Sequence, residues 1–384
     1  MMMYLDLTET ALKQKDAFWT AKEIQQQPLV WEKSVTELEA NKSRIDNFLQ
    51  PLLARKDLRI IFTGAGTSAF IGSCILPIVA ASTGLRVEAI PTTDIVSNPH
   101  EYLQADVPTL LVSFGRSGNS PESVATVDYA DSIINQCYQL ALTCNAEGEL
   151  FKRCTGSNKL AIAMPAETND VSFAMTSSFS SMMLSALYVF CPQQNFMQQL
   201  QQSIFASEAV ISEYNEALTG VAKKQYKRVI YLGSGMFKGL AQEAALKLLE
   251  LTDGAAVSSF DSPLGFRHGP KAIVNSDTLI MLFVSNNPHT RKYDLDLLAE
   301  LQADSEVGQI VVISAQSAPQ LAASDSLMLA GMESAQDSFL LFPYIVCAQI
   351  YAFQHALAIG NTPDNPSASG TINRVVQGVN IHVL

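Results

Sequence analysis

The chain has 384 residues, of which 48% are hydrophobic and 16% charged, and its formal net charge at neutral pH is −12. This length predicts two domains, each with its own core. The acidic balance, uninterrupted by any run of Lys and Arg, argues against nucleic acid and anionic membranes as partners. An anionic ligand would need a local site made of backbone N–H groups, hydroxyls or a single arginine.

The cysteines and residues 1–30 both argue against secretion. The six cysteines have no C-x-x-C spacing, which predicts reduced thiols in the core rather than disulfides or a zinc site. They are Cys74, Cys137, Cys144, Cys154, Cys191 and Cys347. Residues 1–30 are mixed and polar without an apolar h-region, so we expect a cytoplasmic protein. No metal and no cofactor is expected.

In chain order, a helical segment comes first and an internal repeat follows. Residues 1–50 show helical periodicity and no strand pattern. Residues 59–66 read RIIFTGAG, and residues 228–235 read RVIYLGSG. Each copy has a charged start, an apolar run and a Gly-x-Gly turn, which is typical of a parallel strand leading into a helix. The repeat predicts two similar halves.

Both halves continue with strand and helix patterns in the same order. Further strands are predicted at 109–113 and 139–143, then at 278–284 and 309–314; helices are predicted at 68–83, 121–135, 236–252 and 293–303. This alternation predicts an α/β fold with two doubly wound parallel sheets. The predicted parts are an N-terminal helical extension (1–50), two domains (51–215 and 216–360) and a C-terminal tail (361–384) rich in Asn, Ser, Gly and Pro.

The most apolar stretch of the chain is 339–359. Pro343, Gln349, Gln354 and His355 interrupt it where a bilayer would penalise polar groups. We therefore predict a buried helix here and no membrane partner.

A serine-rich loop follows the strand predicted at 109–113. Residues 115–123 read GRSGNSPES, and the earlier loop at 64–68 reads GAGTS. Glycines allow the backbone to come close to a ligand, hydroxyls donate hydrogen bonds, and Pro121 suits a first helical turn. In a doubly wound sheet such loops lie at the carboxyl ends of strands, where helix N-termini can bind a phosphate.

A purely structural role is the alternative for this loop. Ser120 could be only a helix N-cap, and Gly118 only a turn residue. The second half of the chain has SNNPHT at 285–290, without a Ser-Gly pair. If the serines merely stabilised the fold, both repeats would be expected to need them. The asymmetry favours a ligand role, with an anion cradle kept in the first half and lost in the second.

The second half carries candidate acid and base groups. Glu243, Lys247 and Glu250 are spaced i, i+4 and i+7, so they share one face of a helix. We expect Ala245, Leu248 and Leu249 to form the buried face of this helix. A solvated Glu–Lys pair is the ordinary alternative. A ligand role is favoured because the helix begins at a Gly-x-Gly strand end.

His268 is a candidate for proton transfer. It lies in a loop beside Gly269 and Pro270, without the apolar packing that usually explains a histidine, and an imidazole titrates near neutrality. The remaining histidines have no supporting constellation and are interpreted as structural or exposed. They are His100, His289, His355 and His382.

Taken together, these motifs resemble the SIS (sugar isomerase) domain proteins, and especially the isomerase half of glucosamine-6-phosphate synthase. The matching features are GTS at 66–68, S-G-x-S at 117–120, E-x-x-x-K-x-x-E at 243–250 and HGP at 268–270. The FRHGP motif and the tail NTPDNPSASGTINRVVQGV (361–379) resemble the corresponding segments of the AgaS group. This closer resemblance covers nearly the whole chain.

The resemblance implies roles for particular residues. Thr67, Ser68, Ser117 and Ser120 would hold a sugar phosphate, and the candidate substrate-binding set also includes Gly66, Ser113, Arg116 and Arg374. Glu250 would move the proton between C1 and C2, and His268 would open the sugar ring, reaching a partner subunit's site. Glu243 and Lys247 complete the candidate catalytic set. The synthase has a tail lysine near the position of Gln377, so a Schiff base from this tail is not expected.

The function implied is that of a galactosamine-6-phosphate deaminase/isomerase, which gives tagatose 6-phosphate and ammonia. One alternative is a tagatose-6-phosphate ketose/aldose isomerase, which would use the same residues. Another is a non-catalytic sugar-phosphate sensor, which would need the serine loop but neither Glu250 nor His268. A homodimer or higher homo-oligomer is expected because sites in this family borrow residues across subunits.

Overall fold

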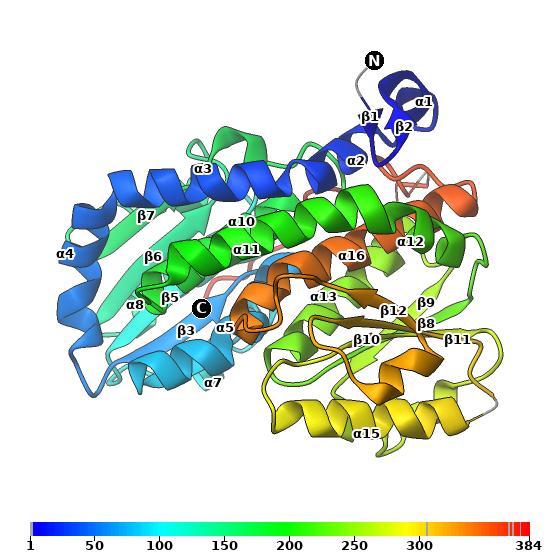
Figure 1. Cartoon of the computed structure of the whole chain (residues 1–384). Coiled ribbons are helices and arrows are strands. Elements are labelled where there is room, and N and C mark those ends of the chain that lie inside the picture. The colour runs from blue at the N-terminus through cyan, green and yellow to red at the C-terminus, as the bar shows by residue number, and fades with distance from the viewer. Residues whose placement is uncertain (1–2, 305, 368, 371, 377) are drawn as a thin grey trace. The chain divides into compact units, whose positions relative to one another are not determined.

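The computed structural model describes residues 3–304, 306–367, 369–370, 372–376 and 378–384, which form two compact units (Figure 1). The first-sheet unit comprises Leu29–Val171, Met175–Gln193 and Ser369–Leu384. The second-sheet unit comprises Met1–Pro28, Ser172–Ala174 and Gln194–Ala368. Each unit is built around one five-stranded parallel sheet, which confirms the predicted α/β fold.

The first sheet has the strand order β4-β3-β5-β6-β7, and all its neighbours are parallel. Its strands are β3 (Arg59–Thr63), β4 (Arg86–Ala89), β5 (Thr109–Gly115), β6 (Cys137–Thr143) and β7 (Lys159–Ala163). The helices within residues 29–193 are α4 (Lys42–Leu53), α5 (Thr67–Thr83), α6 (Thr92–Ser97), α7 (Pro99–Tyr102), α8 (Pro121–Ile133), α9 (Glu149–Arg153), η1 (Ala166–Thr168) and α10 (Ser177–Phe190), and α3 (Gln27–Ala40) begins just before them. Every residue of β3 and β5 is buried, as expected for strands covered on both faces.

The second sheet has the order β12-β11-β10-β8-β9 and is also parallel throughout. Its strands are β8 (Arg228–Gly233), β9 (Val257–Asp261), β10 (Thr278–Phe283), β11 (Gln309–Ser314) and β12 (Asp325–Met328). The helices of this part are α11 (Phe196–Ala209), η2 (Val210–Tyr214), α12 (Asn215–Ala222), α13 (Met236–Leu251), α14 (Pro263–Phe266), η3 (Pro270–Ile273), α15 (Thr290–Ala303), η4 (Pro319–Ala323) and α16 (Asp337–Ala358). Helix α11 groups with this sheet, although the predicted boundary at residue 215 placed it with the first.

The N-terminal segment differs from its prediction in one respect. It contains helices α1 (Glu9–Gln14) and α2 (Phe18–Gln25), but a short antiparallel hairpin of β1 (Met3–Tyr4) and β2 (Leu7–Thr8) precedes them. The expectation of no strand in residues 1–50 was therefore wrong. The two residues between these strands, Leu5 and Asp6, have φ of 47° and 63°, a left-handed turn that apolar periodicity does not predict.

Helix α16 confirms the predicted buried helix at 339–359. It has 22 residues and is long and apolar enough to cross a bilayer by length and composition, but 94% of its most apolar window is buried inside the structure. It packs against α11, α12 and α13 of its own unit. Its composition therefore reflects its position in a protein core.

His355 of α16 is a buried imidazole, and its ionisation is expected to make the stability depend on pH. It is 1% exposed, and its Nδ1 lies 3.0 Å from the Tyr351 hydroxyl. Burial, assisted by the nearby Lys227 cation, lowers the pKa of His355 to about 4. The folded protein therefore keeps the ring neutral at a pH where the unfolded chain binds a proton.

We predict that His355→Gln makes the stability less dependent on pH. The contribution of His355 is complete above the unfolded pKa of about 6.5 and is lost as the pH falls towards about 4. Between about pH 7 and about pH 5 the wild-type protein should lose about 2 kcal/mol of unfolding free energy through this residue. Urea unfolding at both pH values measures the difference. The exposed His100→Gln is the control, and an equal pH dependence in wild type and His355→Gln would refute the prediction.

Candidate functional site

A small pocket lies at the carboxyl edge of the first sheet, where the two predicted phosphate loops leave their strands. Its volume is about 110 Å³. It is lined by Ala65, Ser68, Phe114, Gly115, Arg116, Ser117, Gly118, Ser120, Ser123, Met175, Arg374, Val375 and Val376. Pockets for whole drug-sized ligands measure about 300–1,000 Å³, so this pocket suits one phosphoryl group and not a complete hexose phosphate.

The serine loop has a backbone conformation that requires glycine at one position. Gly118 has φ of +64°, and a Cβ there would lie 3.3 Å from both Leu150 Cβ and Thr143 Oγ1. Two side chains from the end of β6 hold the loop: Thr143 Oγ1 donates to Gly115 O at 2.6 Å, and Asn145 Nδ2 donates to Ser117 O at 2.9 Å. These two hydrogen bonds therefore fix the loop conformation independently of any ligand.

Ser120 caps helix α8 and also lines the pocket, so the structural and the ligand interpretations are compatible. Its Oγ accepts a hydrogen bond from Ser123 N at 3.4 Å and lies 2.6 Å from Ser123 Oγ. Ser117 Oγ accepts from Asn119 N at 3.2 Å. Ser123 belongs to the pocket but was not singled out as a site residue. Its position three residues after an N-cap serine was the available signal.

The first loop contributes Ser68 from helix α5. Ser68 is 5% exposed, and its Oγ lies 3.8 Å from Met175 Sδ. Gly66 is the N-cap with φ of +56°, and Thr67 is the buried first residue of the helix. Gly66, Thr67 and Ser113 do not line the pocket, and Ser113 is a buried residue of β5. Of the predicted substrate-binding set, the structure brings Ser68, Arg116, Ser117, Ser120 and Arg374 together.

The C-terminal tail covers this pocket through two arginines. Arg116 is 6% exposed, and its Nη2 donates to Arg374 O at 2.8 Å. Arg374 Nε donates in turn to Asp170 O at 3.1 Å, which brings Val375 and Val376 to the pocket wall. Both guanidinium groups hold main chain and add positive charge beside the pocket. Gln377, the residue near the synthase lysine, lies outside the described residues.

Asp170 also fixes the segment whose main chain accepts hydrogen bonds from Arg374. It is fully buried, and its carboxylate accepts hydrogen bonds from the backbone N–H groups of Thr176 at 2.8 Å and Ser178 at 2.9 Å, at the start of α10. Carboxylates are favourable at helix N-termini because the N–H groups there lack partners. Asp170 was not predicted as a site residue, since a carboxylate seven residues before the helix that it caps has no fixed sequence signature.

The cysteine nearest this site does not supply a nucleophile. Burial raises the pKa of the Cys144 thiol to about 12, with a hydrogen bond to Thr168 opposing the shift and the Asp170 charge adding to it. The six cysteines are all free and buried, as predicted. The thiol of Cys144 is therefore protonated at neutral pH and unreactive.

The charged residues of α13 form a buried cluster, so the solvated alternative is wrong. The side chains of Glu243 and Lys247 are 0% and 1% exposed, and Lys247 Nζ lies 3.5 Å from Glu243 Oε1. Lys247 Nζ also pairs with Glu250 Oε2, and Glu250 is 21% exposed. The assignment of Leu249 to the buried face was also wrong, because Leu249 is 41% exposed. The helix is buried on its charged face as well as on its apolar face, where Ala245 and Leu248 are buried as predicted.

His268 lies in an exposed loop that is fixed at both ends. Its backbone N–H donates to Gly265 O at 2.9 Å. The residues on either side of the loop pair with one carboxylate of α15: Arg267 Nε lies 2.8 Å from Glu300 Oε2, and Lys271 Nζ lies 2.7 Å from Glu300 Oε1. The imidazole is thus displayed to solvent on a loop whose backbone is tied to a helix.

Glu250 and His268 lie on opposite faces of the second sheet. Phe266, two residues before His268, packs with Ile230 of β8 and Leu297 of α15 on one face. Helix α13, which carries Glu250, packs against α16 on the other face, toward which the next residue of β8, Tyr231, points. Within one copy of this unit, the carboxylate and the imidazole therefore do not converge.

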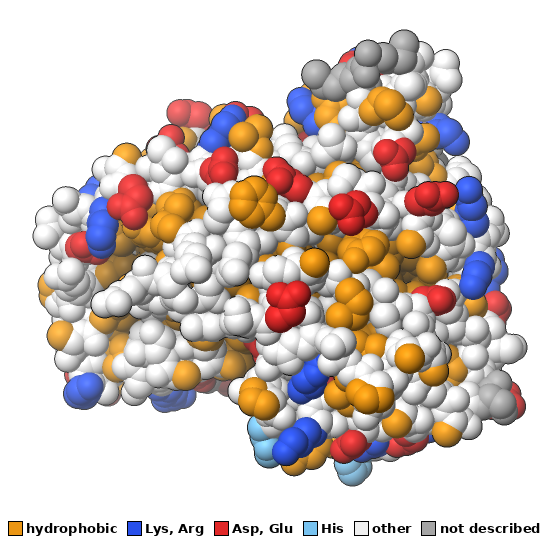
Figure 2. Space-filling model, viewed as in Figure 1, with side chains coloured by type: hydrophobic (Ala, Val, Ile, Leu, Met, Phe, Trp, Pro, Cys, Tyr) orange, Lys and Arg blue, Asp and Glu red, His pale blue; other side chains and the backbone are white. Residues whose placement is uncertain are grey.

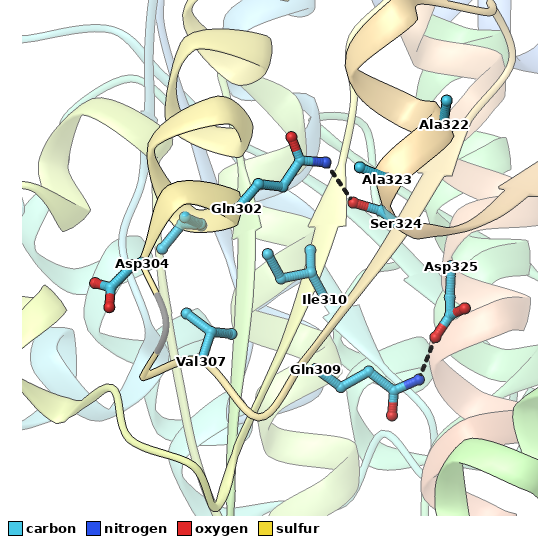
Figure 3. A pocket seen from close by; sticks show the side chains of 10 residues that line it. Gln302, Asp304, Val307, Gln309, Ile310, Ala322, Ala323, Ser324 and Asp325 are labelled. Carbon is cyan, nitrogen blue, oxygen red and sulfur yellow. Dashed lines mark hydrogen bonds between the residues drawn. The ribbon is translucent and has the colours of Figure 1, made fainter.

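A larger pocket lies at the other edge of the second sheet. It has a volume of about 490 Å³, and Figure 3 shows it between the end of α15 and the first residues of β11 and β12. Gln302 Nε2 donates to Ser324 Oγ at 2.7 Å, and Gln309 Nε2 donates to Asp325 Oδ2 at 2.5 Å. Because ligands of doubly wound sheets bind at the carboxyl ends of the strands, this amino-end pocket is a poor candidate for the active site.

Neither a metal-binding cluster among the described residues nor a basic patch on the face drawn in Figure 2 is present. Among them, no group of three or more His, Cys, Asp and Glu side chains could hold a metal. On the face drawn in Figure 2, the Lys and Arg side chains shown in colour are scattered among acidic ones and form no continuous basic patch. A small anion held by one loop fits this charge distribution better than an extended one.

The family comparison agrees with this geometry. The model for the SIS domain matches residues 52–191 and 224–360, one match for each sheet. The chain is thus a protein with two SIS domains, and the serine loop belongs to the first.

Individual relatives indicate the group within the SIS domain family to which this chain belongs. D-galactosamine-6-phosphate deaminase AgaS of Escherichia coli is 48% identical over 368 residues, which cover 95% of each chain. The protein of the same name from Shewanella sp. (strain ANA-3) is 45% identical over 98% of this chain and 95% of its own. The crystal structure of tagatose-6-phosphate ketose/aldose isomerase from Escherichia coli matches with a TM-score of 0.90 and 45% identity, covering 95% of this chain and 96% of that one. The chain therefore belongs to the AgaS group of the SIS domain family.

We predict that Lys247→Met destabilises the protein by about 3–5 kcal/mol, because it removes the cation that pairs with a fully buried carboxylate. Chemical denaturation measures the change. Lys238→Met on the same helix is the matched control, since Lys238 is half exposed and its pair with Asp261 should contribute less than about 1 kcal/mol. Equal, small effects of the two substitutions would show that the Lys247 cluster is not a buried ion pair in solution.

Proposed function

We propose that this protein is a D-galactosamine-6-phosphate deaminase that gives tagatose 6-phosphate and ammonia. The observation that carries the proposal is the near full-length match to proteins named D-galactosamine-6-phosphate deaminase AgaS, at 48% and 45% identity. The pocket for one phosphoryl group at the serine loop of the first SIS domain supports it. The protein acts in the cytoplasm as a homodimer or larger homo-oligomer.

The substrate phosphate binds in the serine-loop pocket. Hydroxyls of Ser68, Ser117 and Ser120 and the N–H groups of the loop donate to its oxygens, and Arg116 adds positive charge. Gly66, Thr67 and Ser113 shape the strand ends that carry these groups. Because the pocket admits only the phosphoryl group, the sugar carbons extend beyond it.

The chemistry is a proton transfer followed by hydrolysis. His268 donates a proton to the ring oxygen while the C1 hydroxyl releases its proton to water, which opens the sugar to the free aldehyde with its amine at C2. Glu250 then removes the C2 proton while the C1 oxygen takes a proton from water, which gives an enolamine. Glu250 returns its proton to C1, which leaves a protonated ketimine at C2. Water adds to this ketimine and expels ammonia, so galactosamine 6-phosphate and water become tagatose 6-phosphate and ammonia. Lys247 holds the Glu250 carboxylate in place.

His268 is contributed to the site by a second copy of the chain. The positions of Glu250 and His268 on opposite faces of the second sheet support this assignment. An exposed imidazole on a loop tied to Glu300 suits a group that must reach into a neighbouring subunit's site. Each active site then uses Glu250 of one subunit and His268 of another.

A plain ketose/aldose isomerase is the second candidate. The 45% identical Escherichia coli structure carries that name, and a substrate with a hydroxyl at C2 would use the same base and acid. The two reactions share every step up to the protonation of C1. They differ only in whether C2 then carries an imine that water can hydrolyse.

Ammonia release from galactosamine 6-phosphate tests the proposal. The purified protein should release one ammonia for each tagatose 6-phosphate formed, and both products can be measured in coupled assays. Interconversion of tagatose 6-phosphate with its aldose, without ammonia from the amino sugar, would favour the isomerase. Turnover of neither substrate would contradict both candidates.

Glu250→Gln is the control variant for this assay. A general base contributes about 10²- to 10⁴-fold to a rate, so kcat should fall by about that factor while substrate binding changes little. Full turnover in this variant would show that Glu250 is not the base.

Mixing two inactive variants tests the shared site. In a hybrid dimer of Glu250→Gln and His268→Ala subunits, one of the two sites should contain both wild-type groups. The mixture should therefore recover up to about half of the wild-type activity per hybrid dimer, in a co-expression assay with two affinity tags. No recovery in isolated hybrids would show that each subunit uses its own His268.

A further inference from the structure

The carboxyl edge of the second sheet has a feature that its loop after β10, which lacks the Ser-Gly pair, does not suggest. Thr63 pairs with Ser113 in the first sheet, so the next residues, Gly64 and Phe114, correspond through the repeat to the pair Gly233–Phe283 in the second. Helices α8 and α15 begin at equivalent positions, because each starts seven residues after its phenylalanine, Phe114 or Phe283. The two sheets can therefore be compared position by position.

An aspartate occupies the second-sheet position that corresponds to Ala125. Asp294 follows Phe283 by as many residues as Ala125 follows Phe114, and each is the fifth residue of its helix. Asp294 is fully buried. A buried carboxylate needs hydrogen-bond donors around it, because burying a charge without partners costs free energy.

Those donors come from the two loops that would hold a phosphate in the first sheet. Asp294 Oδ1 accepts from Ser234 Oγ at 2.5 Å, and Oδ2 accepts from Ser285 N at 2.9 Å. Ser234 corresponds to Ala65, and Ser285 corresponds to Arg116, and both of these residues line the first-sheet pocket. The Asp294 carboxylate thus takes the place that an anion would take between the equivalent loops.

A second carboxylate completes the arrangement. Asp337, the first residue of α16, accepts from Ser285 Oγ at 2.5 Å through Oδ2 and from Asn286 N at 2.8 Å through Oδ1. Asn286 corresponds to Ser117. Two hydroxyls and two loop N–H groups are thus bound by two carboxylates, which present four oxygens in place of those of a phosphate.

We propose that the second SIS domain retains an anion cradle and that Asp294 and Asp337 occupy it permanently. The sequence suggested that the second half has lost the cradle. We infer instead that the cradle is present and that two carboxylates of the same chain occupy it. Each chain then binds one sugar phosphate, and the second domain gains a fixed link between its two loops and helices α15 and α16. The inference concerns a site outside the one proposed for the substrate.

The surroundings of the two carboxylates are consistent with this role. Burial raises the pKa of Asp294 to about 6, with the Ser234 and Ser285 hydrogen bonds opposing the shift, and burial also raises the pKa of Asp337. The nearby cation is Arg291, which is 8% exposed and donates to Ser314 Oγ at 3.1 Å. Tyr344 of α16 donates to Val284 O at 2.7 Å and closes the other side.

An ordinary helix cap would look different. A capping carboxylate sits at or before the first residue of its own helix and binds N–H groups of that helix. Asp294 lies in the second turn of α15 and binds groups of the loops after β8 and β10. Asp337 also binds the loop after β10 and not its own helix. Both carboxylates therefore hold neighbouring loops through hydrogen bonds and do not cap their own helices.

Removing one carboxylate should open the cradle to a free anion. We expect Asp294→Ala to melt at a lower temperature than the wild type and to be stabilised by inorganic phosphate more than the wild type is. The matched control is Asp296→Ala, which removes the same charge from an exposed position of the same helix and should respond to phosphate as the wild type does. Thermal melting against phosphate concentration gives the result, because a ligand that binds only the folded state raises the melting temperature.

The reciprocal substitution covers the case in which Asp294→Ala does not fold. Ala125→Asp should fill the first-sheet cradle in the same manner and abolish binding of inorganic phosphate, measured by calorimetry, while Ala125→Asn should retain more of it. The proposal is overturned if Asp294→Ala shows no phosphate response beyond that of Asp296→Ala, or if Ala125→Asp binds phosphate like the wild type. It is also overturned if the wild-type chain binds two phosphates. Failure of the deaminase assay alone would leave these readouts unchanged, since none of them measures turnover.

Discussion

The backbone N–H groups at the carboxyl edge of a parallel sheet need acceptors, and the organisation of this protein follows from how each sheet meets that need. In the first SIS domain, glycines and short hydroxyl side chains surround a pocket of about 110 Å³. In the second, the equivalent groups are bound by Asp294 and Asp337. The two repeats thus carry one open pocket and one pair of buried carboxylates at equivalent strand ends, and the difference depends on a few side chains and not on the fold.

The cluster on α13 shows a similar use of buried charge. Glu243 and Lys247 are withdrawn from water, which costs free energy unless they remain paired. Their pairing leaves Lys247 able to hold Glu250, which is partly exposed at the end of the helix. A base on a flexible surface side chain would sample many orientations, whereas one held by a buried ammonium is restricted in position. The buried pair is therefore best understood as the support of the proposed base.

Much of this could be predicted from the sequence, and the failures have physical causes. The central strands were found because strands covered on both faces are continuous apolar runs, as in β3, β8 and β10. The outer strands were missed because they are short and partly polar, as in RVEA of β4 and DSLM of β12. Leu249 was misplaced because α13 buries its charged residues as well as Leu248 and Leu251, and Leu249 lies on the side that remains exposed. The Arg374–Asp170 contact joins segments far apart in the chain and leaves no local pattern.

The size of the serine-loop pocket bears on how the proposed substrate would be selected. A site that holds only the phosphoryl group cannot distinguish one hexose 6-phosphate from another, because the oxygens it contacts are common to all of them. Selection between an amine and a hydroxyl at C2 must therefore come from groups around the sugar carbons. Glu250 and the His268 of a second subunit are the proposed contacts there, and they act on the atoms at which the candidate substrates differ. Binding energy from the phosphate then serves to orient the sugar towards these groups, and the chemistry at C2 decides which reaction follows.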